Sequence, residues 1–537
     1  MNISNLKISK NFSTFFFILF FIFGFSKIKD YGITYDELEY RQQGFVMLKH
    51  IADKTFPNLT KKIIKEKKLD YPSIQNYLGN IKNNYKTHHT LFAGLEFLFF
   101  KDSPKKVIYL FRHYMNFLMS SIMIIFFYKL LRLNFNRSIS LLGSTLFFFN
   151  PKIFPDFIYN PNDIWFTFFL TICLYFGLYF IKKKKIKYFY LLPIFISLAL
   201  STRIIGLYYY FIFLFIWILN INLENRNIDT KVIYSLLLQL VILIFSLYIL
   251  TPQLWENPLT AFNEIFLGQI KFNGIDPQIM FLGEITSASN VSRYYLIVWI
   301  LISTPIVILF FFLIGLCAIF YNYYKTKFLN LYLFTMLIYL FAPLIAIQIF
   351  KPVIYNGWRH FYFLYPAIIY VSIYGLDFIC KIKLLKKIKE VSFLLIFLNF
   401  AYLINWSIQN HPHQYVFFNI LSKKNSYKFE NDYWGASDLS AIKFILQNDK
   451  KKIITITGLG NTRVDFTLNL LSNDELNRLK VVKVSENNFN DDIDYYISRF
   501  NDGLNVQKYL ENGFKVYNSV KVDDKSINTT FTYKKYK

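Results

Sequence analysis

Ionisable side chains stand at the ends of long apolar runs in this sequence, and two of them are adjacent carboxylates. Asp36 and Glu37 follow the first apolar run, in the stretch Tyr31-Gly32-Ile33-Thr34-Tyr35-Asp36-Glu37. A carboxylate in this position can take a proton from a hydroxyl group and so act as a general base. The spacing Thr34-x-x-Glu37 also fits a capping box at the start of a helix, which explains Glu37 but not Asp36. The sequence therefore leaves two interpretations of this pair: a purely structural role, or a catalytic role for one of the acids.

Other charged groups lie at the ends of later apolar runs. Asp163 begins such a run, where an ionised group is costly unless it faces a polar cavity; a helix N-cap is the alternative. Arg359 offers a fork of donors suited to phosphate, whereas snorkelling is the alternative for Arg203. The candidates for substrate binding are Asp163, Arg203, Glu284, Arg293, Arg359 and His360.

The composition indicates a membrane protein. The chain has 537 residues, of which 54% are hydrophobic, and a mean hydropathy of +0.31. A soluble chain of this length would not carry so many long apolar runs. The net charge of +26 is assigned to basic loops beside the membrane, so nucleic acid is not predicted as a partner.

About eleven apolar runs are long enough to be considered as membrane spans. They cover residues 11–27, 107–130, 138–152, 163–181, 188–203, 205–221, 232–251, 294–322, 328–349, 360–380 and 391–407. We therefore predict an all-α polytopic membrane domain over residues 1–407, whose first outer loop, residues 28–104, carries the acidic motif. Residues 408–537 are less apolar and are predicted to form a small α/β domain, with strands at 453–457, 481–484, 493–497 and 514–517.

Lysine and arginine residues gather in the short loops after every second run. Examples are Lys182 to Lys185 after the fourth run, and Lys325 and Lys327 after the eighth. The positive-inside rule places these loops in the cytoplasm. The acidic pair, the other candidate site residues and the C-terminal domain then face the outer side, which is the periplasm if the chain lies in a bacterial inner membrane.

The sequence leaves the metal site unknown, and it specifies no cofactor. The three cysteines fall inside apolar runs and show no ligand spacing. His88 and His89 are adjacent, so their side chains diverge on a helix, and a solvated turn is favoured over a metal site. A divalent cation, Mg²⁺ or Mn²⁺, could still bind the carboxylates.

The order of several short motifs resembles a known family. These motifs are the Asp36-Glu37 pair, Asn160-Pro161-Asn162-Asp163, Thr251-Pro252-Gln253-Leu254-Trp255, Gly357-Trp358-Arg359-His360-Phe361-Tyr362, His411-Pro412-His413-Gln414-Tyr415 and Asp432-Tyr433-Trp434-Gly435. They resemble the GT-C superfamily of lipid-linked-sugar-dependent glycosyltransferases, in the branch of the protein mannosyltransferases and aminoarabinose transferases (family 39-like). In that family a His-Pro-type motif often follows in the first loop, but here Thr90 follows His89, which puts a role for either histidine in doubt.

The resemblance implies an inverting transferase in the membrane. The donor would be a sugar linked to a polyprenyl phosphate, and the acceptor would be a hydroxyl or phosphate of a glycan, lipid or protein. Asp36 would act as the base or as an acid that positions the acceptor, and Arg203 or Arg359 would hold the phosphate. A membrane transporter or lipid flippase is the alternative, although the sequence shows no internal repeat typical of transporters. A structural membrane component with a periplasmic binding domain would leave the acidic pair unexplained.

Overall fold

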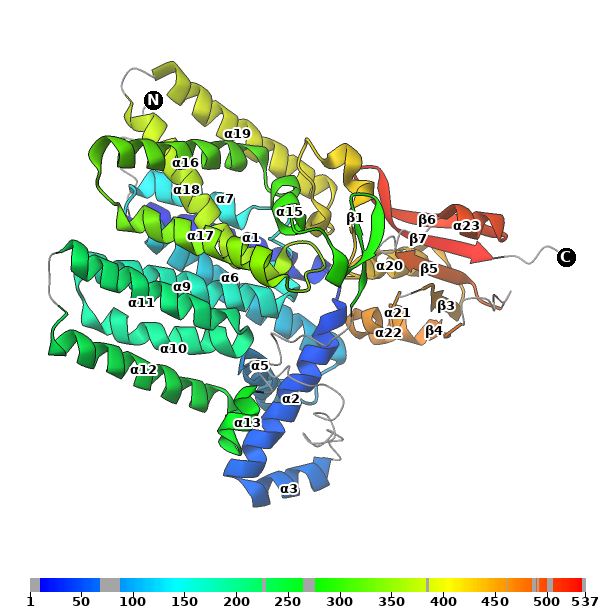
Figure 1. The fold of residues 1–537 in the computed structure, drawn as a ribbon. Helices are drawn as coiled ribbons and strands as arrows, with labels where there is room; N and C mark the ends of the chain where they lie inside the picture. Colours follow the sequence, from blue (N-terminus) through cyan, green and yellow to red (C-terminus); the bar gives the residue numbers. More distant parts are fainter. Residues whose placement is uncertain are drawn as a thin grey trace.

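The chain folds into a bundle of long helices with a small β-sheet at one end (Figure 1). The computed structural model describes residues 10–67, 87–224, 228–263, 276–382, 386–460, 462–484, 489, 492–499 and 506–533. Within lipid, a helix satisfies every backbone hydrogen bond inside one segment, so apolar runs of this length form helices. The predicted fold class, an all-α polytopic membrane protein with a small C-terminal α/β domain, is confirmed.

Nine helices among the described residues are long and apolar enough to cross a membrane. They are α1 (Lys10–Lys27), α6 (Lys105–Leu131), α9 (Pro161–Lys183), α11 (Ile205–Leu223), α12 (Thr230–Leu250), α16 (Ile306–Thr326), α17 (Leu331–Phe350), α18 (Tyr365–Lys381) with the 3₁₀ turn η6 (Arg359–Leu364) before it, and α19 (Lys386–Gln409). Helix α10 (Ile186–Thr202) is apolar but shorter, and α7 (Arg137–Phe148) has 12 residues. The predicted runs thus all fall on helices, but two of these helices are shorter than a full span.

Two predicted runs differ from the observed helices because of proline. The run 138–152 stops as helix α7 at Phe148, ahead of Pro151. The run 294–322 is divided into α15 (Tyr295–Ser303) and α16, because Thr304 before Pro305 is extended, with φ −89° and ψ 135°. A proline disfavours helical geometry in the residue that precedes it, so each break follows from the sequence.

Short helices, 3₁₀ turns and a hairpin cover the end of the bundle that carries the sheet (Figure 1). They are η2 (Ile28–Asp30), α2 (Tyr35–Thr55), α3 (Pro57–Lys67), α5 (Thr87–Phe99), α8 (Asp156–Tyr159), η3 (Pro252–Trp255), α13 (Pro258–Phe262), β1 (Gln278–Phe281), β2 (Glu284–Ser287) and η5 (Ala288–Asn290). The basic connections α9–α10 and α16–α17 lie at the opposite end. This arrangement agrees with the predicted separation of basic loops from candidate site residues.

The C-terminal region contains a mixed sheet of five strands in the order β4-β3-β5-β7-β6. The strands are β3 (Ile454–Gly458), β4 (Leu479–Val481), β5 (Tyr495–Arg499), β6 (Phe514–Val522) and β7 (Lys525–Tyr533). Strand β3 pairs in parallel with β4 and β5, and β7 pairs antiparallel with β5 and β6. The other elements here are η8 (Gln414–Val416), η9 (Lys423–Lys428), α20 (Asp438–Asn448), α21 (Val464–Thr467), η10 (Leu468–Leu470), α22 (Asn473–Asn477) and α23 (Val506–Glu511).

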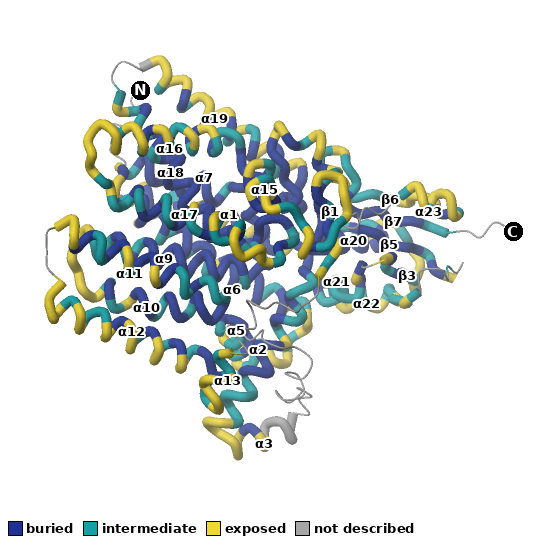
Figure 2. The backbone as a smooth tube through the Cα atoms, in the orientation of Figure 1, coloured by how far each residue is buried: buried dark blue, intermediate teal, exposed yellow. Residues whose placement is uncertain are grey.

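Burial separates central from peripheral helices (Figure 2). The most apolar window is 83% buried in the segment Arg359–Lys381 and 72% buried in α9, but only 22% buried in α12. The exposed apolar faces of the peripheral helices are suited to contact lipid. The central α9 and η6–α18 segments can therefore carry polar residues at their ends, shielded from lipid by their neighbours.

Candidate active site

The helix α2 places Asp36 in its first turn. Thr34 is the N-cap, and the Glu37 Oε1 atom accepts from the Thr34 backbone N–H at 2.8 Å, as part of a complete capping box. The other Glu37 oxygen, Oε2, lies 2.8 Å from Nε2 of His113 on α6. Both oxygens of this buried side chain are therefore engaged. These contacts favour the structural alternative for Glu37, for which the sequence alone left a catalytic role open.

Asp36 points in a different direction from Glu37 and meets a cation. Its Oδ2 atom accepts from the Tyr40 hydroxyl at 2.9 Å and from Nη1 of Arg359 at 3.4 Å. The Asp36 side chain is 34% exposed, whereas that of Arg359 is 6% exposed. One carboxylate oxygen is thus held from inside the protein while the side chain stays accessible from outside.

Asp163 begins the buried helix α9 and organises the cations around it. Its N–H donates to Oδ1 of the N-cap Asn160 at 3.2 Å, and Nδ2 of Asn160 donates to the Asp163 Oδ2 atom at 2.8 Å. Arg203, which follows α10, forms an ion pair with the Asp163 Oδ1 atom. Arg359 reaches the Asp163 Oδ2 atom at 3.5 Å. Asp163 is therefore not the helix N-cap, a role that Asn160 takes; it lies in the first turn of α9 as the partner of two cations.

Aromatic rings fix the Arg359 guanidinium in place. It lies 4.4 Å from the ring centroid of Trp434 and 5.8 Å from that of Tyr355. His360 packs edge-on against Tyr355, with 5.1 Å between the ring centroids, and lies close enough to Arg203 and Asp163 to interact with their charges. A guanidinium stacked on aromatic faces is held without losing its hydrogen-bond donors.

Two hydrogen-bond donors in this cluster lack an acceptor and could bind an anion. The Nε–H groups of Arg203 and Arg359 are buried and have no hydrogen-bond acceptor among the described residues. A buried donor without an acceptor costs about 1–3 kcal/mol, so an incoming acceptor would relieve this cost. Arg203 is 27% exposed, so its side chain can be reached from outside.

A second buried acid lies behind the cluster. Asn160 also donates through Nδ2 to Oδ1 of Asp156 at 2.8 Å, and the Tyr362 hydroxyl donates to Oδ2 of Asp156 at 3.2 Å. Burial raises the pKa of Asp156 to about 7, and it lowers the pKa of the nearby Lys152 to about 8. Asp156 therefore supports Asn160, which in turn orients Asp163.

Two predicted site residues lie elsewhere. Glu284 is exposed at the start of β2, and the side chain of Arg293 is exposed before α15. Within the described part of the chain, neither side chain has a hydrogen bond or ion pair with the cluster formed by Asp36, Asp163, Arg203 and Arg359. The structure therefore brings Asp36, Asp163, Arg203, Arg359 and His360 together, and leaves Glu284 and Arg293 on the surface.

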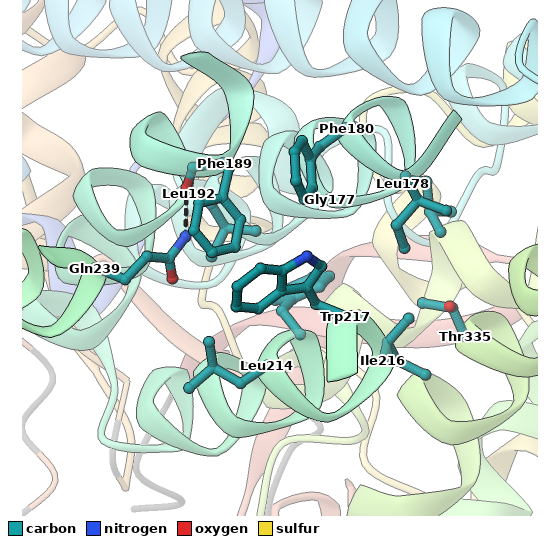
Figure 3. A pocket seen from close by; sticks show the side chains of 12 residues that line it. Gly177, Leu178, Phe180, Phe189, Leu192, Leu214, Ile216, Trp217, Gln239 and Thr335 are labelled. Carbon is teal, nitrogen blue, oxygen red and sulfur yellow. Dashed lines mark hydrogen bonds between the residues drawn. The ribbon is translucent and has the colours of Figure 1, made fainter. Parts of the chain in front are cut away.

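One apolar cavity lies away from this cluster. It has an empty volume of about 380 Å³ and lies among α9, α10, α11, α12 and α17, lined by residues such as Gly177, Trp217 and Gln239. Figure 3 shows its apolar side chains and the bond from the Gln239 amide to the Phe189 carbonyl. Gly177 is fourteen positions after Asp163 on α9, which is about 21 Å along a helix. No charged side chain lines this cavity, so it offers none of the acids and cations found at the cluster.

Metal ligands do not gather in the described part of the chain. No group of three or more His, Cys, Asp or Glu side chains that could hold a metal ion is found there. His88 Nε2 lies 3.2 Å from Oδ1 of Asn162, and His89 Nδ1 lies 3.2 Å from Oε1 of Gln43. The predicted solvated turn is wrong, because both histidines are buried on helix α5. Their rings meet edge to face, with 4.3 Å between the centroids, although their ring nitrogens reach different partners.

Three further residues at the site were not predicted as such. Tyr40 holds Asp36, Asn160 bridges Asp156 and Asp163, and Trp434 lies against Arg359. A signal existed for Tyr40, because it is four residues after Asp36 and so on the same helix face. Trp434 stands in one of the motifs quoted above, but nothing local in the sequence links it to Arg359.

Comparison with known proteins gives a family match for part of the chain. Residues 98–249, a little over a quarter of the sequence, match the model of the family described as dolichyl-phosphate-mannose-protein mannosyltransferase. This segment contains Asp163 and Arg203. The resemblance inferred from the motifs is thereby confirmed over this segment. No curated protein matches the chain.

Solved structures match over more of the chain at low identity. ArnT from Cupriavidus metallidurans bound to undecaprenyl phosphate matches with a TM-score of 0.46 and 10% identity, over 98% of each chain. The archaeal oligosaccharyltransferase AglB from Archaeoglobus fulgidus, in complex with an inhibitory peptide and a dolichol-phosphate, has a TM-score of 0.44 and 12% identity, over 91% of this chain and 70% of that one. The apo oligosaccharyltransferase of Archaeoglobus fulgidus has a TM-score of 0.39 and 13% identity, over 73% of this chain. The present chain covers only 56% of the length of that protein.

Proposed function

We propose, from the match of residues 98–249 to a protein mannosyltransferase family and from the charged cluster, that the chain is a membrane glycosyltransferase. Its donor is a sugar linked to a polyprenyl phosphate. Its acceptor is a hydroxyl or phosphate group of a glycan, lipid or protein. The observation that carries the proposal is the meeting of a partly exposed acid, Asp36, with two guanidinium groups that retain free donors.

The acid has the role of general base. The acceptor O–H gives its proton to Asp36 as the oxygen attacks the anomeric carbon of the sugar. The bond from that carbon to the phosphate oxygen breaks at the same time, and the electron pair leaves with the polyprenyl phosphate. Attack from the side opposite to the leaving group inverts the anomeric configuration.

The cations have the role of holding the leaving group. Negative charge grows on the phosphate as the bond breaks, and donors already fixed in place stabilise it without reorganising. The Nε–H groups of Arg203 and Arg359 are suited to this task because they lack acceptors among the described residues. Asp163 keeps both guanidinium groups at one place through its two oxygens.

We also propose how the chain is oriented in the membrane. The chain is an integral membrane protein, with nine apolar helices of spanning length among the described residues. We place the basic loops in the cytoplasm, and hence the site and the C-terminal domain on the outer side. In a bacterial inner membrane this side is the periplasm.

The test is a transfer assay with purified protein in detergent or vesicles. Labelled polyprenyl-phosphate sugars are incubated with the protein and a membrane extract, and the labelled acceptor is identified. We expect the wild type to transfer label and Asp36→Asn to abolish transfer. Asp53→Asn, on the same helix and paired with Lys49, is the matched control and should stay active. Label that moves across vesicles without bond formation would instead indicate a transporter.

A further inference from the structure

One segment of the C-terminal region contacts both Arg359 and the loop that carries Asp36. Residues 430–438 lie just before and at the start of α20, beside the start of α2 (Figure 1). Nearly all of this segment is buried. Its contacts on one side are with Arg359, and its contacts on the other side are with Gly32 and Tyr35, in the loop that leads to Asp36.

On the Arg359 side, the segment contacts both the backbone just before Arg359 and the Arg359 side chain. Oε2 of Glu430 accepts from the Gly357 N–H at 3.3 Å and from the Tyr295 hydroxyl at 3.0 Å. Gly357 has φ +69°, and it turns the chain just before Arg359. Trp434 then supports the Arg359 guanidinium at 4.4 Å. The position of this cation is therefore set from the C-terminal region as well as from Asp163.

On the Asp36 side, the segment holds the preceding residue, Tyr35. The Tyr35 hydroxyl donates to Oδ2 of Asp438 at 3.4 Å. Gly435, with φ +72°, passes so close to the Tyr35 ring that a Cβ atom there would lie 2.6 Å from Cε1. Similarly, a Cβ atom on Gly32 would lie 2.5 Å from the Ala436 carbonyl oxygen. The loop that carries Asp36 is thus packed against this segment with no space for a side chain.

The C-terminal sheet anchors the segment. Nδ2 of Asn528 on β7 donates to Oδ1 of Asp438 at 2.8 Å. Nη1 of Arg499 on β5 donates to the Asp432 carbonyl at 3.1 Å, and the Arg499 guanidinium lies 4.2 Å from the Tyr35 ring centroid. The two strands are adjacent in the sheet, so their contacts with the segment form one rigid support.

We propose that residues 430–438 are a positioning element, fixed by the C-terminal sheet, that holds the Arg359 guanidinium and the loop carrying Asp36 in the places where they act. This inference rests on the proposed function, and it assigns a role to the C-terminal domain. A base and a leaving-group cation act in the same step, so the position of each relative to the substrate determines the rate. A misplacement of about 1 Å can cost about 100-fold in rate.

The two sides of the segment predict different kinetic effects. Trp434→Leu removes the aromatic support of Arg359 and should raise the KM for the lipid-linked donor about tenfold, the range of a desolvated cation–π contact. Tyr35→Ala frees the loop before Asp36 and should lower kcat about 100-fold with little change in donor KM. Trp434→Phe and Tyr35→Phe retain the rings and should restore most of each loss.

The experiment measures kcat, donor KM and thermal unfolding for each variant, and the stabilisation that each gains from undecaprenyl phosphate. Trp406→Leu is the matched control, because this buried tryptophan contacts Phe417 and Asp523 instead of the cluster. We expect Trp434→Leu to lose stabilisation by undecaprenyl phosphate, and Tyr35→Ala and Trp406→Leu to keep it.

Two outcomes would overturn the inference, and they are distinguishable. If the wild type transfers sugar but Trp434→Leu and Tyr35→Ala change kcat and KM in the same proportion as Trp406→Leu, the segment only stabilises the fold. If the wild type transfers no sugar from any polyprenyl phosphate, the proposed function fails and the inference fails with it.

Discussion

Asp36 and Arg359 are 323 residues apart in the chain, yet the Asp36 Oδ2 and Arg359 Nη1 atoms lie 3.4 Å from each other. The same nitrogen lies 3.5 Å from Oδ2 of Asp163. One buried guanidinium therefore joins the first outer loop to the start of α9. Under the proposed function, the donor phosphate would compete with two carboxylates for this cation, so we expect its binding to depend on the geometry of the guanidinium.

The variant Arg359→Lys tests this geometry. Lysine keeps the charge but has no planar fork, so it cannot contact two carboxylates and a phosphate together. We expect kcat/KM for the lipid-linked donor to fall about 100-fold, as for loss of about 3 kcal/mol of transition-state stabilisation. Arg132→Lys, whose side chain binds the Phe135 carbonyl, should retain wild-type kinetics. A normal kcat/KM for Arg359→Lys would mean that the fork is not used.

The variant Tyr40→Phe tests the support of the base. Phenylalanine keeps the stacking on His89, where the ring centroids are 4.6 Å apart, but loses the O–H that donates to Asp36. A hydrogen bond to a charged group is worth about 1.5–3 kcal/mol, so we expect kcat to fall at least about tenfold. Donor KM should stay constant. An unchanged kcat in steady-state assays would show that Asp36 is oriented by other contacts.

The variant Glu37→Ala tests the structural role of the second acid. The change removes the capping box and leaves His113 without its carboxylate partner, a loss of about 1–3 kcal/mol in the free energy of unfolding. Thermal unfolding in detergent should show a lower Tm. Glu37→Gln keeps the acceptor for Thr34 and should lose less stability. Full loss of transfer in a Glu37→Gln variant with normal Tm would instead assign Glu37 to the chemistry.

The variant Asp438→Asn tests the pH dependence of stability. Burial raises the pKa of Asp438 to about 7, against about 3.9 for an unfolded aspartate. The folded chain therefore binds this proton more tightly, so its contribution to stability is fully present below about pH 4 and is lost as the pH rises to about 7. Asparagine cannot ionise, so the Asp438→Asn variant should not lose this part of its stability as the pH rises.

The measurement is Tm from pH 4 to pH 8 for the wild type and Asp438→Asn. Burial also raises the pKa of Asp156 and of Glu430 to about 7, so both proteins should lose stability in this window. The wild type should lose more, and the difference between the two curves isolates Asp438. Parallel curves would show that Asp438 is not titrating in this range.

Removal of divalent cations tests the metal requirement. Arg203 and Arg359 already lie against the carboxylates of the cluster, so we expect transfer to continue in EDTA. The measurement is the initial rate of sugar transfer with and without the chelator. A rate that is lost in EDTA and restored by Mg²⁺ or Mn²⁺ would show that the carboxylates bind a metal ion during the reaction.

The helices were predictable because each depends on its own run of residues. Apolar length identifies the spans, and Pro151 and Pro305 mark the places where predicted runs break. Strand β7, in contrast, was not predicted. Its sequence, Lys525–Tyr533, is rich in polar residues, and its burial comes from the neighbours β5 and β6 on both sides, which no local pattern reports.

The candidate site was predictable where a charge stood at the end of an apolar run. Asp163, Arg203 and Arg359 carried that signal, since a charge is costly there without a partner. The same signal did not separate Asp36 from Glu37, because both fit the start of α2. Glu284 and Arg293 were also predicted, but both are exposed, Glu284 in β2 and Arg293 before α15, where a charge needs no partner. The support of Arg359 by Trp434 depends on how the chain folds back, which spacing alone does not encode.

The packing of residues 430–438 against the first outer loop has a consequence for biosynthesis. The ribosome makes Asp36 early, but the sheet that fixes its surroundings ends at Tyr533. A nascent or truncated chain would have the base and the membrane helices without the finished arrangement. Such a chain would lack the contacts of Asn528 with Asp438 and of Arg499 with the Asp432 carbonyl, so we expect the proposed transfer to begin only once the sheet is in place.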